Sequence, residues 1–251
     1  MEGIEKTSHR IVVADAKKFT DALGVVSKLV NDVLFKFEQE GLKIIAMDQA
    51  NCAMVDFTYK SSGFVEYSFK APGQYGIDLG KLKPILDRAG SKDIITLEFD
   101  DQITITLKGK GVKKYTARII ADIEDKQKKV PDMIFSASIK LKSKELVEYV
   151  DDASVVADRI QLFAEKGRFG IGTSSELNTL SMDIIPTEIV VQSEKQVTSK
   201  YSIEYLNKLL EGKKISEDVT VRFGTDYPMK LEFKTDYIEL NYVLAPFVSN
   251  E

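Results

Sequence analysis

Two stretches decide the fold because one repeats the other: Leu82-Lys-Pro-Ile-Leu-Asp-Arg-Ala-Gly-Ser-Lys-Asp-Ile-Ile-Thr-Leu-Glu-Phe99 and Leu206-Asn-Lys-Leu-Leu-Glu-Gly-Lys-Lys-Ile-Ser-Glu-Asp-Val-Thr-Val-Arg-Phe223. They align without a gap, so that Leu82 matches Leu206 and Phe99 matches Phe223. The distance between them is about half of the chain, which is too long for a solenoid of short repeats. The repeat therefore indicates two copies of one small domain.

The chain has 251 residues, enough for two domains of ordinary size. A polar, charged run that ends with Val130-Pro131 separates the two halves and has the composition of an exposed linker. We therefore expect an N-terminal domain over 1–120, a connecting loop over 121–134 and a C-terminal domain over 135–251.

Hydrophobic periodicity predicts two helices and several short strands in each half. The predicted helices cover 16–30, 76–89, 143–156 and 203–210, and Asp15 is the expected N-cap of the first. The predicted strands cover 9–14, 33–37, 42–47, 52–59, 64–69, 94–99, 103–107, 114–120, 135–141, 160–164, 167–172, 179–184, 189–197, 219–223, 229–234 and 237–244. Each half would pack two helices against one face of an antiparallel sheet, which is an α+β fold.

The composition argues against most kinds of catalytic site. The single histidine, His9, argues against a Ser-His triad and a histidine-rich metal site, and the single cysteine, Cys52, excludes a zinc ribbon and a disulfide framework. Acidic pairs such as Asp100-Asp101 lack the spacing of a metal site. We therefore predict no catalytic residue, no bound metal and no cofactor. The sequence also lacks an apolar run of the ~18 residues that a membrane span needs and a signal-peptide pattern.

Basic residues gather on the helix faces that point away from the predicted core. They are Lys17, Lys18, Lys28, Lys81, Lys83, Arg88, Lys208, Lys213 and Lys214. Two interpretations stay open at this point: an ordinary amphipathic surface, or contacts to nucleic-acid phosphates without base recognition. The net charge of −4 means that any such contact must come from a local face. The third predicted helix is an exception, because Glu148, Asp151 and Asp152 make its outer side acidic.

One segment carries a specific resemblance: Gly41-Leu-Lys-Ile-Ile-Ala-Met-Asp-Gln-Ala-Asn-Cys-Ala-Met-Val-Asp-Phe57. It is similar to the proliferating cell nuclear antigen family of DNA sliding clamps. Further similarity occurs at Asp78-Leu79, at Val130-Pro131 and at Tyr242-Val-Leu-Ala-Pro246, in the same order along nearly the whole chain. The chain ends soon after Leu-Ala-Pro, as archaeal-type members do.

The resemblance implies a DNA polymerase processivity factor rather than an enzyme. In this family, three two-domain subunits form a pseudo-six-fold ring around duplex DNA, with helices lining the hole and sheets forming the wall. It implies that the basic residues above face DNA. It also implies that an edge strand of one subunit pairs with an edge strand of the next. Here the interface residues would be Tyr115, Ala117, Ile119, Asn178, Leu180 and Met182.

The resemblance further implies a hydrophobic pocket that receives a short partner peptide with one aliphatic and two aromatic anchors. The pocket residues would be Met47, Asn51, Cys52, Val130, Phe135, Pro228, Val243, Ala245 and Pro246. The implied partners are double-stranded DNA of any sequence, further clamp subunits of the same or another kind, DNA polymerase, clamp loader, flap endonuclease and DNA ligase, with no membrane. The implied location is the nucleoid in the cytoplasm of an archaeon, or the nucleus of a eukaryote.

Two alternatives remain. The first is a checkpoint-type or monomeric clamp-like processivity factor, which the mass of the protein in solution would distinguish. The second is a metal-dependent hydrolase that uses dispersed carboxylates, which stoichiometric binding of a divalent metal would support.

Overall fold

The computed structural model describes residues 9–68, 72–121, 123 and 131–247. Its contacts divide the chain into two units. Unit 1 comprises Met1–Ala46, Asp56–Lys129 and Asp236–Glu239, and unit 2 comprises Met47–Val55, Val130–Thr235 and Leu240–Glu251. Each unit is described by itself.

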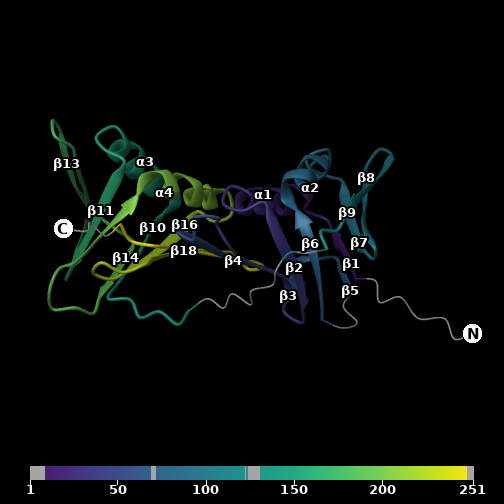
Figure 1. The fold of residues 1–251 in the computed structure, drawn as a ribbon, viewed down its shortest axis with the longest axis horizontal. Helices are drawn as coiled ribbons and strands as arrows, with labels where there is room; N and C mark the ends of the chain where they lie inside the picture. The colour runs from purple at the N-terminus through teal and green to yellow at the C-terminus, as the bar shows by residue number, and fades with distance from the viewer. Residues whose placement is uncertain (1–8, 69–71, 122, 124–130, 248–251) are drawn as a thin grey trace, which may run out of the picture. The chain divides into compact units, whose positions relative to one another are not determined.

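The order of helices and strands occurs twice along the chain (Figure 1). The first copy contains β1 (His9–Val13), α1 (Ala16–Val26), β2 (Asp32–Glu38), β3 (Gly41–Met47), β4 (Ala53–Lys60), β5 (Glu66–Ser68), β6 (Gly73–Asp78), α2 (Leu79–Leu86), β7 (Ile94–Phe99), β8 (Gln102–Lys108) and β9 (Val112–Arg118). The second copy contains β10 (Ala137–Lys142), α3 (Ser143–Ser154), β11 (Arg159–Glu165), β12 (Arg168–Ser174), β13 (Thr179–Ile184), β14 (Glu188–Val191), β15 (Val197–Ser202), α4 (Ile203–Leu209), β16 (Asp218–Phe223), β17 (Met229–Lys234) and β18 (Ile238–Leu244). Short 3₁₀ helices follow β4 (Ser61–Gly63) and α4 (Leu210–Lys214).

The strand order within the sheets is also duplicated. In the first copy the orders are β5-β1-β7-β8-β9 and β4-β3-β2-β6. In the second copy the corresponding orders are β14-β10-β16-β17-β18 and β13-β12-β11-β15. The pairs with a described register are antiparallel, for example β1 with β7 and β10 with β16. The duplicated α+β architecture that the sequence predicts is therefore confirmed.

Each unit has its own hydrophobic core. Helix α1 contacts α2 in unit 1, and α3 contacts α4 in unit 2 (Figure 1). The repeat-matched Leu82 and Leu206 are both buried, as are Phe99 and Phe223. The alternation of buried and half-buried residues along β7, β8 and β16 gives each strand one face toward the core.

Helix α1 begins where the sequence predicts it. The Asp15 carboxylate accepts a hydrogen bond from Lys18 N at 3.0 Å, which satisfies one of the free amides at the helix start. Its end at Val26 is earlier than the predicted residue 30. Lys28 N and Leu29 N donate to carbonyls three residues back, to Val25 O and Val26 O, so the last turn tightens out of the α-helical pattern.

Two predicted elements are wrong. The helix over 76–89 starts only at Leu79, because Gly76, Ile77 and Asp78 pair with β2 as the end of β6. Its N-cap is Asp78, whose Oδ1 accepts from Lys81 N at 3.0 Å. The predicted strand over 189–197 covers most of β14, the connection 192–196 and only the first residue of β15, which continues to Ser202.

In the described part of the chain, no helix combines the length and the apolar character that crossing a lipid bilayer requires.

The duplicated core predicts that matched positions carry similar energies. Leu82 is 1% exposed and Leu206 is 2% exposed, so Leu82→Ala and Leu206→Ala should each destabilise the protein by about 2–5 kcal/mol. Leu177→Ala, at a side chain that is 90% exposed, is the control and should change stability by less than about 0.5 kcal/mol. Urea unfolding measures these changes. If either core variant unfolds at the same urea concentration as the wild type, the two matched positions do not have equivalent places in the two cores.

Candidate functional site

The turn between β3 and β4 is organised by one carboxylate. Asp48 is 9% exposed, and its Oδ1 accepts hydrogen bonds from Cys52 N and Ala53 N, each at 2.8 Å. Its Oδ2 accepts from Ala50 N at 3.2 Å and from the Tyr205 hydroxyl at 2.6 Å. The turn is held in an unusual conformation, since Asn51 has φ of 57°. Asparagine tolerates this left-handed region better than most residues do.

These contacts shift the protonation equilibria of both side chains. Burial raises the pKa of Asp48, but the hydrogen bonds from Tyr205 and the three backbone amides outweigh burial, so the pKa lies below its ordinary value. Donation to this carboxylate raises the pKa of the Tyr205 hydroxyl, and burial adds to the effect. Near neutral pH the pair is therefore an ionised acceptor and a protonated donor.

The residues predicted to bind a partner peptide lie in unit 2. Asn51 and Ala245 are exposed, whereas Met47, Cys52, Phe135, Pro228, Val243 and Pro246 are half-buried. The structure brings Cys52 and Ala245 together, because Ala245 N donates to Cys52 O at 2.8 Å. It also brings Phe135 edge-on to Tyr227, with ring centroids 6.0 Å apart, and Tyr227 precedes Pro228. Val130 lies outside the described residues.

The predicted DNA-facing cations are at the surface. Lys17, Lys18, Lys28, Lys81, Arg88 and Lys214 are exposed, and Lys83, Lys208 and Lys213 are half-buried. Most of them pair with an acid three or four residues away: Lys17 with Asp21, Lys18 with Asp15, Lys81 with Asp78, Lys83 with Asp87, Lys208 with Glu204 and Lys214 with Glu211. Exposed pairs of this kind contribute little to stability, because water and salt screen them. A phosphate can therefore replace the carboxylate at little cost.

Helices α1 and α2 pack closely at Gly24, which lies against the side chain of Lys83. A Cβ added at Gly24 would lie 2.6 Å from Lys83 Cε, so any larger residue there must displace the lysine stem. The basic residues of α1 and α2 consequently belong to one helical layer of unit 1. In unit 2 the layer is mixed, because Glu148, Asp151 and Asp152 of α3 are exposed.

The residues predicted to join subunits lie on or beside two terminal strands. Strand β9 follows β8 at the end of its sheet, and β13 follows β12 at the end of another. Tyr115 and Ala117 are half-buried and alternate with exposed residues along β9, and Ile119 follows that strand. Leu180 and Met182 alternate in the same way along β13, and the exposed Asn178 precedes it. Each set of strand residues thus shares one face of its strand.

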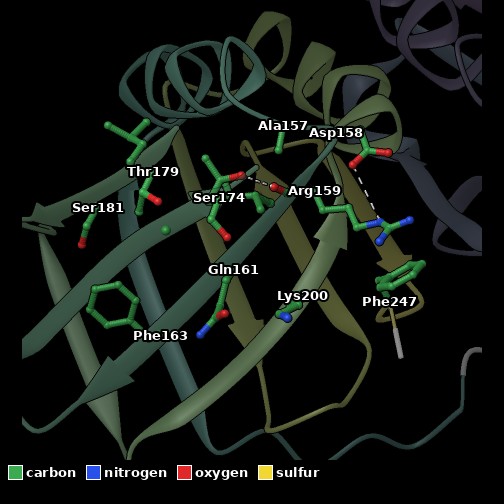
Figure 2. A pocket seen from close by; sticks show the side chains of 14 residues that line it. Ala157, Asp158, Arg159, Gln161, Phe163, Ser174, Thr179, Ser181, Lys200 and Phe247 are labelled. Carbon is green, nitrogen blue, oxygen red and sulfur yellow. Dashed lines mark hydrogen bonds and ion pairs between the residues drawn. The ribbon is translucent and has the colours of Figure 1, made fainter. Parts of the chain in front are cut away.

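A pocket of about 450 Å³ opens on the four-stranded sheet of unit 2 (Figure 2). Its lining includes Thr179, Leu180 and Ser181 of β13, and the C-terminal segment lies at one side of it. There the Arg159 guanidinium stacks on the Phe247 ring, 3.6 Å from the centroid, and Phe247 N donates to Lys200 O at 2.7 Å. Figure 2 shows Phe163 across the pocket from this pair.

Sequence reasoning missed Tyr205 and the stacked pair of Arg159 and Phe247. The partners of these residues are far away in the chain, and Tyr205 lies 157 residues from Asp48. No local spacing pattern signals such contacts. In the described part of the chain, no group of three or more His, Cys, Asp or Glu side chains is placed so that it could hold a metal ion.

The whole-chain comparisons agree with the duplicated fold. The N-terminal domain of proliferating cell nuclear antigen matches residues 12–121, and its C-terminal domain matches residues 129–247. The chain belongs to the proliferating cell nuclear antigen family. The resemblance seen in the sequence is thereby confirmed.

Curated relatives come from archaea. A protein named "DNA polymerase sliding clamp" from Thermococcus gammatolerans is 30% identical over 243 residues, covering 95% of this chain and 98% of the relative. "DNA polymerase sliding clamp 1" from Thermococcus kodakarensis is 29% identical over 243 residues, with the same coverage. "DNA polymerase sliding clamp" from Pyrococcus furiosus is 28% identical over 244 residues, again covering 95% and 98%. The similarity therefore extends over both domains.

The lowered pKa of Asp48 predicts how the turn responds to acid. A lowered folded-state pKa gives stability that is present above the unfolded value of about 3.9 and is lost as pH falls through the folded value. Asp48→Asn should therefore be less stable than wild type near neutral pH, and the difference should shrink as the pH falls below about 4. Urea unfolding at several pH values measures it, and a difference that does not depend on pH would contradict the assignment.

Proposed function

We infer that this chain is a subunit of a DNA sliding clamp, a processivity factor that holds DNA polymerase on its template. Membership of the proliferating cell nuclear antigen family supports this, as does similarity over nearly the whole chain to proteins named DNA polymerase sliding clamp. The family is non-catalytic, so the chain is not an enzyme. Its partners are accordingly DNA and the replication machinery.

In the part of the chain that the structure describes, β9 and β13 each lie at the end of a sheet with a neighbouring strand on one side only, and this observation supports a closed ring. Strand β9 corresponds to β18, and β13 corresponds to β4. Backbone bonds from Lys60 N to Tyr237 O, within unit 1, and from Ala245 N to Cys52 O, within unit 2, hold the ends of β4 and β18 together at 2.8 Å each. The same pairing between β13 of one subunit and β9 of the next is head-to-tail, and such contacts close into a ring.

A ring of three chains would contain six copies of the repeat. In this proposal the interface consists of Tyr115, Ala117, Ile119, Asn178, Leu180 and Met182. Pairing these edges also removes exposed backbone donors and acceptors that would otherwise promote aggregation. Each chain contributes the domains proposed above, 1–120 and 135–251, with the connecting loop 121–134 between them.

The exposed and half-buried cations on and directly after α1, α2 and α4 suit loose contact with DNA. Lysine and arginine bind phosphates without reading sequence, and this binding weakens as salt rises. Because most of these cations already have an acid within one helical turn, each phosphate contact gains little free energy. Weak, interchangeable contacts allow a ring to slide, while the closed ring prevents loss from the DNA.

The turn at 48–52 and the segment at Ala245 suit the binding of a partner peptide. In this proposal clamp loader, flap endonuclease and DNA ligase bind there by peptide motifs, as the polymerase does. Tethering raises the local concentration of each partner, so weak peptide affinity is enough. In an archaeal cell, as for the relatives, the protein would act on the nucleoid in the cytoplasm.

The names of the relatives disfavour the alternatives. They are named as clamps of DNA polymerase, which does not favour a checkpoint-type or monomeric clamp. The hydrolase alternative conflicts with the non-catalytic character of the family.

The ring is tested directly by measuring how long the protein stays on linear duplex DNA with blocked ends and with open ends. Rings are allowed to thread onto linear duplex through free, biotinylated ends, and streptavidin then blocks both ends. The wild type should stay on blocked duplex much longer than on open duplex after dilution. Leu180→Asp buries an unpaired charge at the proposed interface, so it should weaken assembly at least about tenfold and abolish the difference.

Leu177→Asp is the matched control, because this side chain is 90% exposed and three residues away. It should behave as wild type in both retention and sedimentation. Equal retention of the wild type on blocked and open duplex would reject the proposal.

Peptide binding is the second test. A peptide with one aliphatic and two aromatic anchors should bind the wild type, and Met47→Asp should weaken that affinity by at least about tenfold, because the charge enters an apolar site. Calorimetric titration measures both affinities. Val65→Asp, at a side chain that is 68% exposed in unit 1, is the control. Equal affinities for wild type and Met47→Asp would reject this position for the pocket.

A further inference from the structure

We propose that Tyr205 is a positioning residue for the partner peptide: through Asp48, its hydroxyl fixes the turn 48–52 and the C-terminal segment that this turn holds. The inference rests on the proposed function, because it assumes that a peptide binds beside this turn. It adds a residue of α4 that lies outside the set assigned to the pocket.

The first step is the saturation of the Asp48 carboxylate. Its two oxygens accept hydrogen bonds from Ala50 N, Cys52 N, Ala53 N and the Tyr205 hydroxyl. The three amides belong to the turn itself and close it locally. The hydroxyl comes from another element, α4, and therefore ties the closed turn to that helix.

The second step is the rigidity of the donor. Tyr205 lies on α4 between Ile203 and Leu206, which are 4% and 2% exposed, and Leu209 on the same helix is fully buried. A helix anchored by such a face moves little, so its tyrosine is a fixed reference point. The short, charge-assisted bond of 2.6 Å is of the stronger kind.

The third step leads from the turn to the C-terminal segment. Asp48 binds Cys52 N, and the carbonyl of the same residue accepts from Ala245 N at 2.8 Å. Two residues further on, Phe247 N donates to Lys200 O at 2.7 Å. The turn and the C-terminal segment both contain residues assigned to the peptide pocket, and the structure brings them into contact. Displacing the turn therefore displaces both.

Other charged or titratable groups of unit 2 face the pair but do not replace the bond. The Lys208 ammonium lies 5.1 Å from the centre of the Tyr205 ring and pairs with Glu204. The Cys52 thiol donates to Ala50 O at 3.6 Å. None of these contacts supplies a donor to Asp48, so loss of the tyrosine hydroxyl leaves one carboxylate position empty.

The test is a double-mutant cycle on peptide affinity with Tyr205→Phe and Asp48→Asn. Tyr205→Phe should weaken binding about three- to tenfold, as expected for one hydrogen bond to a charged group. In the Asp48→Asn background the same change should have a much smaller effect, since the hydroxyl acts through the carboxylate. A general loss of structure would instead give additive effects.

Tyr149→Phe is the control for removing a hydroxyl from a helix of the same unit. In the described residues this half-buried tyrosine of α3 has no side-chain hydrogen bond, so peptide affinity should stay at the wild-type value. Sedimentation and retention on blocked duplex should be unchanged in all single variants. These two readouts report on the ring and not on the pocket.

The outcomes separate the two proposals. If the wild type fails to bind the peptide, the proposed docking function is wrong. If the wild type binds and Tyr205→Phe binds equally well, or if the effects in the cycle are additive, the positioning role of Tyr205 is overturned.

Discussion

The pairing of backbone groups at strand edges is the constraint on which the rest of the structure depends. Every strand in the two copies has a fixed place in its sheet, and the duplicated order leaves β9 and β13 at the ends of theirs. Unpaired amides and carbonyls along an edge favour the addition of another strand. The corresponding strands β4 and β18 are already held together by backbone bonds near their ends. The proposed ring therefore repeats a contact that one chain already makes.

The charge distribution complements this architecture. The chain is acidic overall, with a net charge of −4, yet the exposed sides of α1 and α2 carry lysines and an arginine. Nearby carboxylates pair with most of these cations, and each pair is weak enough to exchange for another anion. The acidic exposed side of α3 shows that the two copies have diverged in surface charge while keeping the same core.

The sequence predicts the core better than it predicts the site. Periodicity locates α1 and most strands, because burial of one face imposes a regular spacing on residues such as Phe19 and Leu23. It fails at 76–78, where a helix-like pattern continues into residues that pair with β2. It fails also at 189–197, where apolar residues on either side of a turn resemble one strand. Short-range patterns do not contain the pairing information that decides such cases.

The site depends even more on distant contacts. Asp48 is recognisable as a turn residue, but its bond to Tyr205 depends on how α4 packs. The stacking of Arg159 on Phe247 likewise depends on the path of the C-terminal segment. The family resemblance supplies the residues of the proposed pocket, because it carries information about the fold that spacing alone does not. Val130, the linker residue of that set, lies outside the described part of the chain.

The turn at Asp48 also contains the only cysteine of the sequence, Cys52, whose side chain is half-buried. A chain with one thiol needs no engineering before site-specific chemistry. A fluorophore or spin label attached to this thiol would occupy the same position in every molecule. The labelled residue would be the one whose carbonyl accepts a hydrogen bond from Ala245 N. The protein thus has a single attachment site for a spectroscopic label, next to the segment where partners are proposed to bind.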